Sequence, residues 1–308
     1  MNRLQADFLL LLTALIWGTT FVAQREAAGH VGPILFVAVR FALSAIVLAP
    51  IALWEARRSE VRLRGADLRG ALVIGACLCA GCWLQQIALV TTSASNGGFL
   101  TAVYIVIVPL VAWAFTRRPP RPVVLAATFI ALGGAWLLAG ASSGGGWNRG
   151  DLIILGSDLI WALHITLVGH YARGGARPVF LALLQNGITG LASLPVALLL
   201  EPFDVPGLLA VAPAILYGGI VSSGIAFTLQ VIAQRHTPSA EAALIMSLEC
   251  VFAAIAGALL LGERLSGAAW AGAALILVSV VLVEAGPLLR RAREGRVRPA
   301  TTAGGVGG

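Results

Sequence analysis

The sequence has no lysine and little charge of any kind. Only 11% of its 308 residues are charged, whereas 58% are hydrophobic. A water-soluble globular domain has about a quarter of its residues charged, so this class is excluded. The four cysteines do not form a disulfide framework, because three crowd residues 77–82 and Cys250 stands alone. We expect buried thiols, and neither a metal nor a cofactor is predicted.

Long apolar runs occupy most of the chain. A helix that crosses a bilayer needs about 20 mostly apolar residues, and ten such windows fit between the polar breaks. The predicted fold class is therefore an all-α integral membrane protein with ten transmembrane helices. Gly134 and Gly272, in the fifth and tenth windows, indicate close helix contacts. The windows are 6–24, 33–54, 66–90, 95–115, 121–139, 151–170, 178–199, 208–229, 240–261 and 265–286.

The arginines predict the orientation of these helices, because cytoplasmic loops are rich in basic residues. With a cytoplasmic N-terminus, 17 of the 21 arginines lie in cytoplasmic segments, three lie outside and Arg40 lies within a span. Both termini are therefore predicted to be cytoplasmic, in a bacterial inner membrane. The net charge of +7 then reflects topology, and no nucleic-acid partner is predicted. The segment 287–308 is predicted to be a disordered cytoplasmic tail.

The chain is similar to itself at a separation of 144 or 145 residues. Ordered matches over most of both halves indicate a duplication, with five helices in 6–140 and five in 150–286. Because five is odd, the two units must enter the bilayer in opposite orientations. Inverted repeats of this kind are typical of secondary transporters. The matches include Asp7 with Asp151, Trp17 with Trp161, Gly75 with Gly219, and Gln86 with Gln230.

Four stretches carry a likeness to a known family. They are Ala-Leu-Ile-Trp-Gly-Thr-Thr at 14–20, Arg-Phe at 40–41, Thr-Ser-Ala-Ser at 92–95, and Ser-Leu-Glu-Cys-Val-Phe at 247–252 with Leu-Gly-Glu-Arg-Leu at 261–265. On these residues the chain resembles the ten-helix, EamA-type members of the drug/metabolite transporter (DMT) superfamily. The resemblance implies export of amino acids, including aromatic ones, and other metabolites. The family commonly has Glu-Pro where this chain has Glu249-Cys250, so we expect an absent or weaker kink there.

Polar and aromatic side chains share faces of the first and sixth helices, since residues three to four apart lie on one side. Trp17 and Trp161 fall about 15 Å deep, although Trp prefers the membrane interface. They either line a cavity or pack as an aromatic core. The predicted substrate cavity contains Trp17, Thr20, Gln86, Tyr104, Trp161, His164, Gln230 and Glu249, with Thr101, Asn96 and Gln85 as polar neighbours.

Three ionisable residues lie inside the predicted spans, where a charge costs about 2.5–3.5 kcal/mol even on a lenient scale. Arg40 and Asp158 sit at similar depth and are predicted to form a structural or gating ion pair, with a snorkelling Arg40 as the alternative. Glu249 lies at mid-depth, and its counterpart 144 residues earlier is Ile105. It is predicted to couple transport to protons, with His164 as a second candidate. The alternative is a protonated Glu249 that serves packing only.

The sequence thus predicts a secondary transporter that exports amino acids, aromatic or large apolar, by alternating access. Its partners would be a small-molecule substrate, the lipid bilayer and protons. Organic phosphates need several basic residues, and only Arg40 is present within the spans. Organic phosphates are therefore a weaker alternative, and cationic drugs and nucleobases are further alternatives. An intramembrane enzyme is the alternative of a different class, but no His-Glu-x-x-His or Gly-x-Ser-x-Gly motif occurs.

Overall fold

The structure is a computed structural model that describes residues 1–60, 65–140, 148–175 and 177–297. Helices account for all ten predicted spans, and these described ranges contain no strand. The helices of the first half are α1 (Arg3–Ala27), α2 (Pro33–Arg58), α3 (Gly65–Ala88), α4 (Ala94–Thr101), α5 (Tyr104–Thr116) and α6 (Pro122–Gly140). Those of the second half are α7 (Arg149–Arg173), α8 (Pro178–Leu200), α9 (Val205–Ala210), α10 (Ala212–Leu216), the π-helix η1 (Tyr217–Ala226), α11 (Phe227–Ala233), α12 (Ser239–Met246), α13 (Glu249–Leu260) and α14 (Gly267–Val297).

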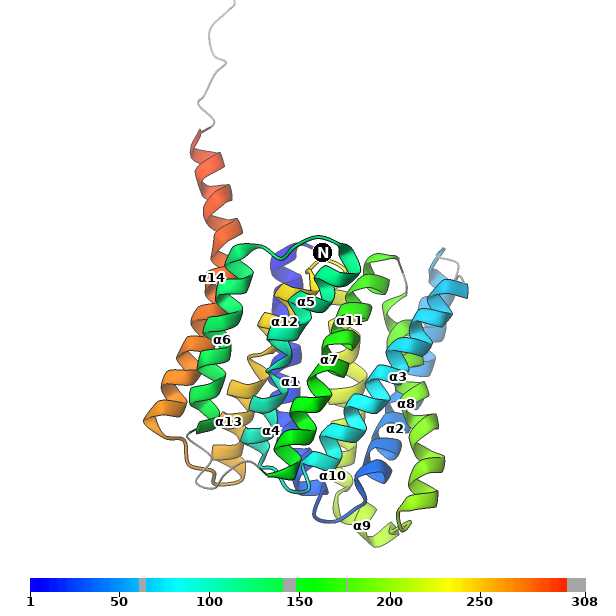
Figure 1. Ribbon diagram of the computed structural model, residues 1–308. Helices are drawn as coiled ribbons and strands as arrows, with labels where there is room; N and C mark the ends of the chain where they lie inside the picture. Colours follow the sequence, from blue (N-terminus) through cyan, green and yellow to red (C-terminus); the bar gives the residue numbers. More distant parts are fainter. Residues whose placement is uncertain (61–64, 141–147, 176, 298–308) are drawn as a thin grey trace, which may run out of the picture.

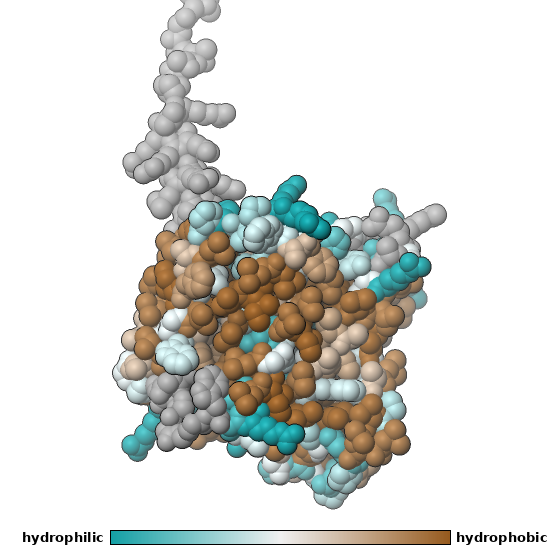
Figure 2. Space-filling model, viewed as in Figure 1, coloured by the Kyte–Doolittle hydropathy of each residue, from teal (hydrophilic) through white to brown (hydrophobic). Residues whose placement is uncertain are grey.

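The outer surface has the character of a membrane-embedded protein. Eight of the described helical stretches are long and apolar enough to cross a membrane, and Pro122–Leu138 and Gly267–Val283 are shorter apolar helices. Large apolar side chains point outward, with Leu191 76% and Leu199 82% exposed. Figure 2 shows a broad apolar belt with hydrophilic residues at its upper and lower rims. Such a surface needs lipid around it, and the predicted all-α membrane fold is confirmed.

The helices of the two halves pack against each other in matching pairs. We call the face that carries the N-terminus the N-terminal face; α1 begins there, whereas α7 begins at the opposite face (Figure 1). α2 packs along α8, and α6 packs along α14. Gly134 permits the second contact, because a Cβ added there would lie 2.6 Å from the backbone oxygen of Gly272. The close contact predicted for these two glycines is confirmed.

The fourth span of each half is broken in the middle. α4 ends and α5 begins around residues 102–103, and α12 ends and α13 begins around 247–248, which is 145 residues later. An absent kink, one of the two outcomes expected here, is therefore wrong, because the helix is interrupted just before Glu249-Cys250 without a proline. Side chains take up carbonyl groups at the break: Ser247 Oγ donates to the Leu244 carbonyl at 2.7 Å, and Cys250 Sγ donates to the Ser247 carbonyl at 2.9 Å.

The eighth span contains ten residues of π-helix, η1, which joins α10 to α11 without a turn. In a π-helix each hydrogen bond joins residues five apart, and such segments are rare and often lie at functional sites. Glycines and serines make up half of η1, as its sequence Tyr-Gly-Gly-Ile-Val-Ser-Ser-Gly-Ile-Ala shows. η1 packs against α1 and α2.

The last helix is longer than predicted. α14 continues to Val297 and leaves the bundle at the N-terminal face (Figure 1). Residues 287–297, which were predicted to be disordered, are therefore helical. The rest of the predicted tail, 298–308, lies outside the described residues.

Candidate functional site in the membrane interior

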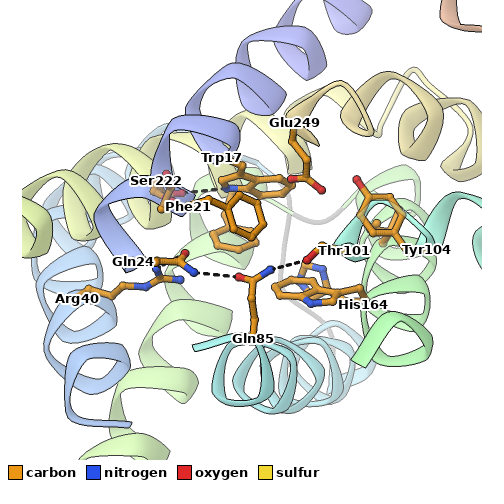
Figure 3. Close-up of a pocket in the computed structure, with 14 residues that line it drawn as sticks. Trp17, Phe21, Gln24, Arg40, Gln85, Thr101, Tyr104, His164, Ser222 and Glu249 are labelled. Atoms are coloured by element: carbon orange, nitrogen blue, oxygen red, sulfur yellow. Dashed lines mark hydrogen bonds between the residues drawn. The ribbon is translucent and has the colours of Figure 1, made fainter. Parts of the chain in front are cut away.

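A cavity lies inside the bundle between helices of both halves (Figure 3). On α1 its lining runs from Trp17 to Gln24, so it occupies the half of that helix farther from the N-terminal face. The lining residues are Trp17, Thr20, Phe21, Gln24, Arg40, Gln85, Thr101, Tyr104, Trp161, His164, Ile165, Ser222, Phe227 and Glu249.

Six of the eight residues predicted for the cavity line it, together with Gln85 and Thr101. The other two predicted residues, Gln86 and Gln230, do not. Gln86 instead donates from Nε2 to the backbone oxygen of Gln24 at 3.0 Å. Gln230 is fully buried away from the cavity, and its amide has no hydrogen-bond partner in the described part of the chain.

Four helices of the first half are joined by a chain of hydrogen bonds along one wall of the cavity (Figure 3). Arg40 Nη1 donates to Gln24 Oε1 at 2.8 Å, and Gln24 Nε2 donates to Gln85 Oε1 at 3.2 Å. Gln85 Nε2 then donates to Thr101 Oγ1 at 3.2 Å. The Arg40 guanidinium also lies 4.8 Å from the centre of the Phe41 ring, a cation–π contact.

The structure does not bring Arg40 and Asp158 together. Arg40 is turned toward Gln24 and Cys82, whose Sγ lies 3.8 Å from Nη2. Asp158 is fully buried on α7, within electrostatic range of Glu249, and both of its carboxyl oxygens lack a hydrogen-bond partner among the described residues. The ion pair expected from the sequence is therefore not formed, and Arg40 belongs to the cavity wall.

Aromatic rings form a second wall of the cavity. The Trp17 ring centre lies 4.9 Å from that of Phe227, and Trp17 Nε1 donates to the Ser222 carbonyl at 3.3 Å. The His164 ring stands edge-on to both Phe227 and Trp161, with each pair of ring centres 5.8 Å apart. Sequence reasoning missed Ser222 and Phe227, because a count of 3.6 residues per turn does not hold through η1.

Glu249 and Tyr104 occupy equivalent places in the two halves. Each is the first residue after the break in its span, and their numbers differ by 145. The Tyr104 hydroxyl points toward the Glu249 carboxyl group (Figure 3). The structural counterpart of Glu249 is therefore Tyr104, and the assignment of Ile105 is wrong because the separation here is 145.

Five buried polar atoms of the lining residues have no hydrogen-bond partner among the described residues. Such atoms are uncommon in folded proteins and call for water or a ligand. No described group of three or more His, Cys, Asp and Glu residues is arranged to hold a metal ion. The five atoms are Arg40 Nε, Tyr104 Oη, Trp161 Nε1, His164 Nδ1 and Glu249 Oε1. Two of them, on Tyr104 and Glu249, belong to groups that face each other.

The cavity is small in this conformation. It leaves about 40 Å³ of free space, whereas pockets that hold small ligands usually measure about 300–1,000 Å³. Ordered water fits such a space. A bound metabolite requires the walls to move apart.

Known proteins resemble this chain over almost its whole length. The profile of the EamA-like transporter family matches residues 4–140 and again 148–285. A protein of Archaeoglobus fulgidus named "Uncharacterized transporter" is 32% identical over 288 residues, which cover 92% of this chain and 86% of the relative. "Uncharacterized transporter YwfM" of Bacillus subtilis is 26% identical over 292 residues, covering 92% and 95%.

A solved crystal structure shares the fold, with a TM-score of 0.71 and 24% sequence identity over 94% of this chain and 99% of the other. The family profile covers nearly every described helix, and the relatives named here are transporters. The chain therefore belongs to the EamA-like transporter family and is a multi-span membrane transporter.

Proposed function

We propose that the protein is a secondary transporter that exports amino acids, with aromatic or large apolar side chains, across the bacterial inner membrane. The observation that carries this proposal is the set of five unpartnered polar atoms around an aromatic cavity. Donors and acceptors left without partners inside a protein favour a ligand that supplies both. An amino acid does so through its carboxylate and its ammonium group.

The charges in the cavity suit a zwitterion. Arg40 Nε and Trp161 Nε1 are donors that suit a carboxylate, and Glu249 Oε1 is an acceptor that suits an ammonium group. Arg40 and Glu249 lie on different sides of the Trp17 ring (Figure 3). An aromatic or large apolar side chain would pack against Trp17 and Phe227. Arg40 is the one arginine among the lining residues, which argues against phosphorylated substrates because these need several bases.

The proposed mechanism is alternating access by two inverted units, 6–140 and 150–286. It is supported by the opposite directions of α1 and α7, by helix breaks 145 residues apart and by the two matches to one family profile. The contracted cavity of about 40 Å³ suits an intermediate that must open to load. With both termini cytoplasmic, as the arginine distribution predicts, the cavity lies nearer the outer face.

Counterflow in proteoliposomes tests the substrate. Vesicles are loaded with one unlabelled amino acid and given trace labelled amino acid outside. We expect transient uptake that is strongest for aromatic and large apolar amino acids. Trp17→Ala should lower the initial rate at least tenfold, whereas Trp54→Ala, at a lipid-facing tryptophan that is 56% exposed, should leave it unchanged. Absence of exchange for every amino acid, in folded protein, would refute the amino-acid proposal.

Proton coupling through Glu249 is tested in the same vesicles with an imposed pH gradient. A carboxyl group buried in a membrane protein is a common proton carrier, so Glu249→Gln should abolish uptake driven by the gradient. Counterflow should be weakened, because the charge that faces the ammonium group is lost, but it should remain measurable. Glu60→Gln, at an exposed carboxylate, is the matched control. Gradient-driven uptake that survives in Glu249→Gln would exclude this residue as the proton carrier.

A further inference from the structure

A second hollow lies at the N-terminal face, away from the central cavity. It is bounded by the ends of α5 and α7, the starts of α1 and α12 and the α5–α6 connection, and it measures about 790 Å³. This volume is within the range of ligand pockets, about 300–1,000 Å³. We call it the N-face groove.

The N-face groove carries an excess of positive charge. Arg3, Arg118, Arg121 and Arg173 line it, and Glu241 is the one carboxylate among the described residues that line it. Glu241 is shared by Arg3, at 2.5 Å from Nη2 to Oε2, and by Arg121. The one hydrogen bond of Arg173 within the described part of the chain goes to the backbone oxygen of Thr237, at 3.5 Å. Neither Arg118 nor Arg173 pairs with a carboxylate in the described ranges, so both remain available to an anion.

Two hydroxyl groups in the floor of the groove also lack partners. Thr166 and Ser239 line it, each is only 3% exposed, and neither hydroxyl oxygen has a hydrogen-bond partner in the described part of the chain. Gly169 makes room for the second, because a Cβ at this position would collide with Ser239 Oγ. Buried hydroxyls next to unpaired arginines are the donors that phosphate oxygens require.

The outer side of the groove is apolar and continuous with the lipid-facing surface. Pro109, Trp113 and Phe115 of α5 line it, and Trp113 and Phe115 are about half exposed, at 48% and 51%. Tryptophan is enriched where a membrane meets water. In Figure 2 the apolar belt reaches up to hydrophilic residues at the upper rim, which is the N-terminal face.

We propose that the N-face groove binds the phosphate head group of one anionic phospholipid, with its acyl chains along α5. Basic pockets between helices on the cytoplasmic side of membrane proteins suit anionic head groups, and the arginine distribution predicts that this face is cytoplasmic. Arg118 and Arg173 contact the phosphate, and Thr166 and Ser239 donate to its oxygens. The site is separate from the amino-acid cavity, so it stands even where the substrate proposal fails.

Native mass spectrometry of the purified full chain tests this site, with dioleoylphosphatidylglycerol and dioleoylphosphatidylcholine as the added lipids. We expect one phosphatidylglycerol per chain, held at least tenfold more tightly than phosphatidylcholine. Arg118→Gln with Arg173→Gln should remove that preference. Arg57→Gln with Arg58→Gln, at the end of α2 on the same face, should keep it.

Thr166→Val distinguishes a specific phosphate site from general attraction between the arginines and an anionic lipid. It removes the hydroxyl donor but keeps every arginine and the side-chain shape. It should weaken phosphatidylglycerol binding about threefold. Equal lipid retention by the Arg118/Arg173 variant and its control would overturn the proposal. Displacement of the lipid by millimolar inorganic phosphate would also overturn it, since a soluble anion would then be the ligand. Circular dichroism and a monodisperse elution profile establish that each variant is folded.

Discussion

At each end of the bundle, an aspartate from the first helix of one half accepts a hydrogen bond from a threonine of the other half. At the N-terminal face, Thr237 Oγ1 donates to Asp7 Oδ1 at 2.8 Å. At the opposite face, Thr92 Oγ1 donates to Asp151 Oδ1 at 2.9 Å. The aspartates are 144 residues apart and the threonines 145, so the two contacts are equivalent.

The surroundings of these two contacts differ in charge. Asp7 also accepts a hydrogen bond from Arg3 at 2.9 Å. Arg3 forms a second ion pair with Glu241, and Arg121 forms an ion pair with the same carboxylate. The N-terminal face thus carries a network of formal charges that joins α1, α12 and the residue before α6.

Among the described residues, Asp151 has neutral donors only. Asn96 Nδ2 donates to it at 2.8 Å, and the backbone nitrogen of Asn148 donates at 3.0 Å. The central cavity lies nearer this neutral end. The comparison teaches that an equivalent aspartate–threonine contact lies at both ends, while formal charges join it at the N-terminal end. In the proposed alternating-access mechanism, we expect the neutral end to open more readily.

The largest expected effect comes from Glu241→Gln. It leaves Arg3 and Arg121 without their shared carboxylate, and hydrogen bonds to charged groups contribute about 1.5–3 kcal/mol. We expect the variant to lose about 2 kcal/mol of stability, measured as a lower melting temperature in detergent by tryptophan fluorescence. Glu60→Gln, at an exposed carboxylate, should melt like the wild type. If Glu241→Gln has the same melting temperature as the wild type, the ion pairs of Glu241 do not stabilise the N-terminal face.

The second prediction is a smaller difference in stability, between the Asp7→Asn and Asp151→Asn variants. Each variant keeps one carbonyl acceptor for its threonine, but only the first loses an ion pair with arginine. We expect Asp7→Asn to be less stable by about 1 kcal/mol. The difference should shrink in 1 M salt, which screens charges that solvent reaches. Melting curves at low and high salt measure this difference, and an equal loss in both variants would contradict the inequality of the two ends.

The smallest effect should be the same at both ends. Thr92→Val and Thr237→Val each remove one neutral hydroxyl donor without a change in shape. Each should lower stability by about 1 kcal/mol, with similar melting temperatures for the two variants. Unequal melting temperatures would show that the two aspartate–threonine hydrogen bonds are not equivalent in strength.

The fold was predictable from the sequence because each spanning helix must satisfy its own backbone within a long apolar run. The breaks at 102–103 and 247–248 were not, since no proline marks them. At the second break Ser247 and Cys250 donate to backbone carbonyls, a role that the residue types alone do not predict.

The cavity was predictable where a regular α-helix carries it. Trp17 and Trp161 follow the 3.6-residue period and face the cavity as expected. Asp158 was the wrong partner for Arg40, which bonds Gln24 instead. Similar depth in the membrane does not determine the direction in which a side chain points. Gln86 and Gln230 were expected in the lining and lie outside it. Both lie near the end of a span, where small deviations from 3.6 residues per turn have added up and change the direction of a side chain.

A π-helix has a wider turn than an α-helix, because its hydrogen bonds span five residues instead of four. The third span is the regular α-helix α3, Gly65–Ala88, whereas the eighth span carries η1 over Tyr217–Ala226. The two duplicated spans therefore differ in which side chains they present to the interior, although η1 continues into α11 without a turn. A change of helical winding offers evolution a way to alter one wall of a duplicated protein without refolding the other.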